Sequence, residues 1–170
     1  MIFRLSTKLA TKLKVKLAQV LPLDPNPFAD WSGHIFTAEH TQFVIVTNTA
    51  SLYSTVFNGR GITQDSHYID RALTSLHEFM QEDGLSFIFE RFIAPASSTV
   101  QFSKALNRSV TGSMNDLIFH AKMWLTEGEL SPLDTTFRLN DIPFSPFKYR
   151  KPREVFTGLT VGPDESAGEA

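Results

Sequence analysis

One polar run has the residue types of a binding or catalytic site: NRSVTGSMND, residues 107–116. Wound as a helix, the run and its continuation place polar side chains three and four residues apart on one edge: Ser109, Ser113, Asp116 and His120. Arg108 and the first backbone amides can hold an anion at the positive end of this helix. Asp116 and His120 can act as an acid–base pair. With Asn107 at the helix start, these residues form the candidate binding site.

The same helix has a structural interpretation, because its polar edge adjoins an apolar face. That face comprises Val110, Met114, Leu117, Ile118, Ala121, Trp124 and Leu125. Polar groups beside a core need partners, so we expect Asp116 to bond to a neighbouring chain segment and Asn107 or Ser109 to cap the helix. The small residues Gly112 and Ser113 would let that segment approach. We favour this packed seam over a binding site. Catalysis is favoured least, since the residues of a Ser–His–Asp triad come from separate elements.

The rest of the sequence offers little further chemistry. The five histidines are scattered, and no HExxH motif occurs, so we expect no metal site. The GxSxG, GxGxxG and P-loop patterns are also absent, and NGRG at 58–61 is typical of a plain turn. We therefore expect no cofactor, and we favour a binding protein over an enzyme.

The elements that must position the candidate site follow from hydrophobic periodicity. Strands are predicted over 34–39, 42–48 and 98–103, and a short strand and an amphipathic helix over 1–16. Segment 42–48 is apolar enough to be a central strand covered on both faces. Helices are predicted over 65–83 (the longest), 85–94, 107–127 and 132–139, with a short one from 152. Residues 49–57 fit a short helix or a further strand, and their spacing favours the helix. The proline-rich segment 21–31 is an irregular connector.

These elements predict an α+β protein, with a small, mainly antiparallel sheet packed against a layer of helices. The 170 residues suit one domain, and the 15 phenylalanines and 42% hydrophobic residues are enough for a core. We expect a single globular domain over 1–159. Residues 160–170 lack apolar anchors and are predicted to be a flexible acidic tail.

Charge and cysteine content limit the classes of partner. The net charge of −2 gives no general case for nucleic acid, but a basic segment near the N-terminus could bind it. That segment carries Arg4, Lys8, Lys12, Lys14 and Lys16, and a later one carries Lys148, Arg150, Lys151 and Arg153. Lysines interrupt every early apolar run, so neither a secretory signal nor a membrane partner is expected. The absence of cysteine fits a cytoplasmic location.

Several segments together resemble a family of small bacterial proteins known only as a domain of unknown function. They are a TKL segment at 7–9, the segment from Thr47 to Ser54, the NRSVTGSMND run, and the segment from Phe144 to Tyr149. The resemblance covers about residues 2–159. It implies a bacterial, cytoplasmic, single-domain protein and implies no activity, cofactor or ligand.

We therefore expect a non-catalytic intracellular binding module whose partner is a protein or a second copy of the chain. One alternative is an enzyme that acts on a small anionic or nucleotide-like substrate at the edge of Arg108, Ser109, Ser113, Asp116 and His120. Another is a nucleic-acid-binding protein that uses the basic N-terminal segment.

Overall fold

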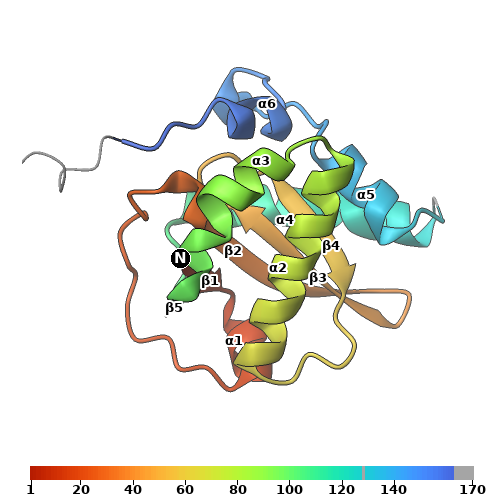
Figure 1. Cartoon of the computed structure of the whole chain (residues 1–170). Coiled ribbons are helices and arrows are strands. Elements are labelled where there is room, and N and C mark those ends of the chain that lie inside the picture. Colours follow the sequence, from red (N-terminus) through yellow and green to blue (C-terminus); the bar gives the residue numbers. More distant parts are fainter. Residues whose placement is uncertain (128, 163–170) are drawn as a thin grey trace, which may run out of the picture.

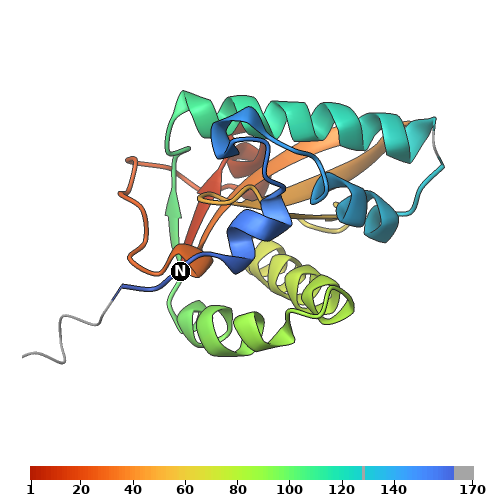
Figure 2. The ribbon, with the colours of Figure 1, turned by 90° about the horizontal axis from the view of Figure 1, so that it is seen from above.

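Two helical layers enclose a five-stranded sheet in the computed structural model, which describes residues 1–127 and 129–162 (Figures 1 and 2). The strands are β1 (Ile2–Leu5), β2 (Asp30–Ala38), β3 (Thr41–Asn48), β4 (Ser54–Asn58) and β5 (Gln101–Ser103). The α-helices are α1 (Thr7–Leu13), α2 (Asp65–Glu82), α3 (Ser86–Ile88), α4 (Arg108–Thr126), α5 (Pro132–Leu139) and α6 (Pro152–Thr157). Shorter helical turns are η1 (Pro27–Ala29), the π-helical η2 (Phe89–Ile93), η3 (Pro95–Ser98) and η4 (Ser145–Phe147).

The sheet has the strand order β4-β3-β2-β1-β5. Antiparallel pairing joins β2 to β3 over eight residue pairs and β3 to β4 over five. Parallel pairing joins β1 to β2 over four pairs and to β5 over three. The sheet is thus mixed but mainly antiparallel. The prediction of an α+β, single-domain fold is confirmed.

Each face of the sheet has its own hydrophobic core, because successive strand side chains point to opposite sides. On one face, Trp31, Val44 and Val46 pack with α1 and α2. On the other face, Phe36 and Ile45 pack with α4 and α5. Figure 2 shows α4 on one side of the sheet and α2 with α3 on the other. The predicted central strand is confirmed, since β3 is buried from Phe43 to Asn48.

Side chains of α5 and of its C-cap residue Asn140 cover the free edge of β4. The backbone N–H of Ser54 donates to Asn140 Oδ1 at 2.8 Å, and that of Val56 donates to Thr136 Oγ1 at 3.0 Å. Asn140 Nδ2 donates in turn to the Ser54 carbonyl at 2.9 Å. An unpaired strand edge is open to pairing with other chains, and these polar side chains satisfy it instead.

A buried polar network joins the start of the chain to the start of β2. Arg4 is 1% exposed, and its guanidinium donates to the Leu21 carbonyl at 2.7 Å and the Pro22 carbonyl at 3.1 Å. Asp30, which is also buried, accepts from Thr49 Oγ1 at 2.8 Å and from the Asp24 backbone at 3.0 Å. Every polar group here has a partner, as a low-dielectric interior requires.

Some local predictions are wrong in instructive ways. Residues 54–58 form β4 instead of the favoured helix, because pairing with β3 supplies backbone hydrogen bonds and burial that a short isolated helix lacks. The strand predicted from 34 begins at Asp30, inside the proline-rich segment. The helix predicted to be the longest, α2, has 18 residues and is shorter than α4, which has 19.

Most of the predicted acidic tail, residues 163–170, lies outside the described residues. Among the described helices, none has both the length and the apolar character needed to cross a membrane.

Candidate functional site

The predicted helix over 107–127 is confirmed as α4, and its first turn has the expected cap. Asn107 is extended at φ −163°, and its Oδ1 accepts from the Val110 backbone N–H at 3.0 Å. This satisfies one of the free amides at the helix start. Met114, Leu117 and Ala121 are buried against the sheet, as the periodicity predicts. Asn107 therefore has a structural role.

The six candidate site residues do not meet at one place. Arg108 and Ser109 are exposed in the first turn, and Ser113 is half-buried one turn later. Asp116 and His120 lie further along and face the segment between α5 and α6. Eight residues separate Arg108 from Asp116, which is about 12 Å along a helix axis. A compact anion site that combines these residues is therefore not formed.

The expected burial of Asp116 in a polar seam is wrong. Its side chain is exposed, and within residues 1–127 and 129–162 it has no hydrogen-bond or ion-pair partner. His120, one turn away, is half-buried and forms no ion pair with it in this part of the chain. The neighbouring segment 142–149 stands off from this edge and leaves a hollow.

That hollow, the α4 groove, has a volume of about 440 Å³. It lies between α4 and the segment that contains η4, and it is lined by Asp116, Phe119, His120, Ile142, Pro143, Phe144, Ser145 and Tyr149. Phe119 and Tyr149 are 68% and 73% exposed. The groove therefore combines one carboxylate, one imidazole and two aromatic rings that are largely open to solvent.

Packing along α4 fixes the ring of His120. The imidazole stacks on Trp124 with centroids 5.5 Å apart and meets Phe119 edge-on at 5.7 Å. Trp124 is itself half-buried against the core beneath α4. His120 therefore lies between Trp124, on the side of the core, and the exposed ring of Phe119.

Tyr149, on the opposite wall of the groove, has a strained backbone conformation. Lys148 and Tyr149 adopt left-handed conformations at φ 53° and 60°. Such conformations cost side-chain-bearing residues about 1–3 kcal/mol each, and they persist only where the surroundings impose them. Here Phe144 imposes them: its carbonyl accepts from the Tyr149 N–H at 2.9 Å, and its buried ring anchors the turn. Strain of this kind is common at binding sites.

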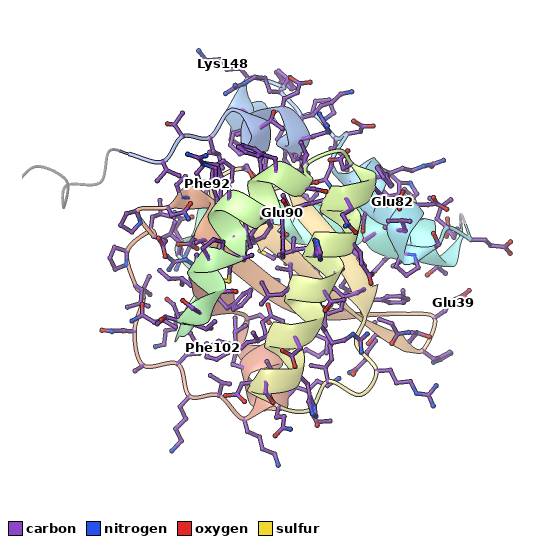
Figure 3. All side chains as sticks on the ribbon, viewed as in Figure 1. Glu39, Glu82, Glu90, Phe92, Phe102 and Lys148 are labelled. Atoms are coloured by element: carbon purple, nitrogen blue, oxygen red, sulfur yellow. The ribbon has the colours of Figure 1, made fainter. Side chains whose placement is uncertain are left out.

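The two basic segments do not form one surface. Arg4 is buried in the polar network, so its place in an exposed basic stripe is wrong. α1 and the labelled Lys148 lie at opposite ends of the molecule in the shared view of Figures 1 and 3. Lys151 pairs with Asp141 at 3.5 Å, and Arg153 with Asp83 at 2.9 Å. Because three of these basic residues are paired with carboxylates and the two segments lie apart, they give only weak support to nucleic-acid binding.

Sequence reasoning named Asp116 and His120 but missed the residues that complete the groove. Phe119 lies between the polar edge and the exposed surface of α4, and Tyr149 is 30 positions further along the chain. The sequence feature that could have indicated these residues is the segment IPFSPFKY, residues 142–149, which is rich in aromatic residues for a loop. Among the residues that the structure describes, no group of three or more His, Asp or Glu side chains could hold a metal ion.

The fold and the groove define a small α+β domain with an exposed aromatic recess. The chain belongs to the family described as Domain of unknown function (DUF6933), whose model matches residues 2–155. A search of curated proteins and a search of solved structures each returned no significant match.

Proposed function

We propose that this protein is a non-catalytic interaction module that binds a partner protein through the α4 groove. The observation that carries the proposal is the pair of exposed rings, Phe119 and Tyr149, on facing walls of the groove. Aromatic side chains that project beside a recess are typical of protein-binding hot spots. A bacterial cytoplasmic setting is part of the same proposal, and the absence of cysteine supports it.

The energetics favour a partner that covers both rings. Full burial of one large apolar side chain contributes about 1.5–3 kcal/mol, so two rings supply about 3–6 of the roughly 8 kcal/mol of a micromolar affinity. Because η4 and the turn at Tyr149 are already held by hydrogen bonds, little further ordering is needed on binding. Asp116 adds an acceptor for a donor from the partner, so we expect the partner segment to carry an apolar anchor beside an N–H or cationic group.

Catalysis has less support than binding. Ser109 and Ser113 do not line the groove, so neither supplies a nucleophile there. Asp116 and His120 line it but are not paired with each other. A general base needs a partner that orients it, and in the described residues only aromatic packing orients His120.

The test is quantitative capture of partners on the immobilised full chain from cells of the source organism. The wild type is compared with Phe119→Ser/Tyr149→Ser, and captured proteins are quantified by mass spectrometry. We expect a specific partner whose capture falls at least about tenfold in the double variant, which corresponds to loss of about 1.4 kcal/mol. Light scattering across protein concentration shows whether the partner is a second copy of the chain.

Phe87→Ser is the matched control, because Phe87 is 66% exposed on α3, remote from the groove. It should retain the partner within about twofold, a change far below that of a hot-spot residue. Equal capture by the double variant and the wild type would show that the groove is not the binding surface. Substrate turnover that is lost when Asp116 is replaced would show instead that the protein is an enzyme.

A further inference from the structure

A second hollow, the β1–β5 crevice, lies at the carboxyl ends of the parallel strands β1 and β5 and has a volume of about 620 Å³. Leu5 of β1 and His34 of β2 line it from the sheet. Ser6 and residues of α1 line a second side, and the β5–α4 junction with Lys104 lines a third. None of these residues belongs to the α4 groove.

This crevice arises from the topology of the sheet, because the helices that follow β1 and β5 cover opposite faces. The chain leaves β1 into α1, whose Leu9, Ala10 and Leu13 join the core on the face that α2 covers. From the neighbouring β5 it passes into α4, which covers the opposite face. Adjacent parallel strands whose following helices diverge to opposite faces leave a gap between the two connections. In α/β sheets, ligands bind in such gaps.

The connecting segment after α1 closes the remaining side. Val15, Leu17 and Val20 of this segment line the crevice. Two hydrogen bonds hold the segment along β5, from the Lys104 N–H to the Gln19 carbonyl at 3.1 Å and from the Leu21 N–H to Ser103 Oγ at 2.9 Å. The apolar wall is therefore fixed in place.

The polar groups of the crevice suit an anion. Within the described residues, the ammonium group of Lys104 has neither an ion pair nor a hydrogen bond, and the ring of half-buried His34 has no hydrogen-bond partner. The lining residues include no carboxylate. Burial lowers the pKa of His34, which keeps the ring neutral and leaves it one N–H donor.

We infer that the β1–β5 crevice binds a small organic acid, whose anionic head contacts Lys104 and His34 while its apolar body packs against Val15, Leu17 and Val20. The combination of a lone cation, a neutral donor and an apolar wall distinguishes this ligand from a bare inorganic ion, which has no apolar part to bury. The inference is independent of partner binding at the α4 groove.

The experiment is an NMR titration of the ¹⁵N-labelled full chain with hexanoate and, separately, with the neutral isostere hexanamide. We expect amide shifts at Ser6, Lys104, Ala105 and Thr111. Hexanoate should bind about five- to tenfold more tightly than hexanamide, the range expected for one charge-assisted hydrogen bond at a partly exposed site.

Lys104→Gln should abolish the preference for hexanoate and leave the binding of hexanamide unchanged. Lys8→Gln is the matched control, since Lys8 is exposed on α1 but does not line the crevice. The NMR spectrum of each variant reports whether it is folded. Equal affinity for acid and amide, shifts outside the crevice, or an equal effect of the two lysine variants would each overturn the inference. So would no binding up to about 10 mM, where a site with a millimolar Kd is largely filled.

Discussion

The guanidinium of Arg4 donates two parallel hydrogen bonds to the carboxylate of Asp30, from Nε to Oδ1 at 2.9 Å and from Nη2 to Oδ2 at 2.8 Å. Both side chains are fully buried. They join the first strand of the chain to the second, and the carbonyls of Leu21 and Pro22 and the hydroxyl of Ser103 accept further hydrogen bonds from the Arg4 guanidinium. Arg suits this position because its planar fork matches a carboxylate in a way that lysine does not.

Removing the charge of Asp30 should strongly destabilise the fold. Asp30→Asn leaves the Arg4 guanidinium buried without a counter-charge, and we expect the free energy of unfolding to fall by about 3–5 kcal/mol in urea titrations. Asp141→Asn provides the comparison, because the Lys151–Asp141 pair has side chains 44% and 68% exposed and should contribute less than about 1 kcal/mol. Similar effects of the two variants would contradict this account of Arg4.

Asp83 attaches α6 to the body of the domain. Tyr53 Oη donates to Asp83 Oδ2 at 2.8 Å, and Arg153 Nε donates to Oδ1 at 2.9 Å. Asp83→Ala should cost about 1–3 kcal/mol, because it leaves the buried Tyr53 hydroxyl unpaired. Hydrogen exchange should accelerate mainly in 152–157.

Tyr53→Phe is the matched variant for this contact. It removes one hydrogen bond but keeps the ring stacked on Phe156, whose centroid is 4.2 Å away. The expected loss is about 1 kcal/mol, with little change in exchange at α6. A uniform increase in exchange across the sheet after Asp83→Ala would show that Asp83 supports the whole fold instead of α6.

Gly33 and Tyr68 are coupled by close packing. A Cβ at position 33 would collide with the Tyr68 hydroxyl, so we expect Gly33→Ala to lower the unfolding free energy by about 1–3 kcal/mol. That hydroxyl is buried with no hydrogen-bond partner among the described residues, so Tyr68→Phe alone should be neutral or stabilising by up to about 1 kcal/mol.

The Gly33→Ala/Tyr68→Phe double variant should recover part of the loss caused by Gly33→Ala. Recovery is incomplete because the ring carbon Cζ and Leu9 Cδ2 still lie 3.2 Å from the added Cβ. Unfolding free energies from a double-mutant cycle give the coupling. Strictly additive effects would show that the collision is relieved elsewhere.

The half-buried position of His34 predicts a pH dependence of stability. Burial lowers its pKa below the ordinary value of 6.5. As the pH falls through 6.5, the unfolded chain therefore binds a proton that the folded chain does not, and the unfolding free energy falls. The loss is complete once the pH lies well below the folded pKa.

His34→Gln removes this contribution. The stability of the wild type relative to this variant should therefore decrease between pH 7 and lower pH, as measured by urea unfolding at each pH. The other four histidines are present in both proteins, so their contributions cancel in the comparison. Parallel pH profiles for the two proteins would mean that folding does not perturb His34.

The segments that resemble the family have structural roles where the structure describes them. Asn48 Oδ1 accepts from the Ser51 N–H at 3.0 Å, which shapes the turn before β4. Asn107 caps α4, and the segment from Phe144 to Tyr149 forms the left-handed turn at the α4 groove. Asp116 of the NRSVTGSMND run and the segment from Phe144 to Tyr149 also line the α4 groove, and Thr7 lines the β1–β5 crevice.

The sequence by itself determined the features that depend on neighbouring residues: the apolar face of α4, the Asn107 cap, the start of α5 at Pro132, and the hairpin of β2 and β3. Each is decided by periodicity or capping within a few turns of chain. Only the tertiary structure decided the pairing of Ile2 with Gln101, the burial of Arg4 and the openness of the edge at Asp116. These depend on contacts between distant segments, whose free energy comes from burial and pairing that no local pattern encodes.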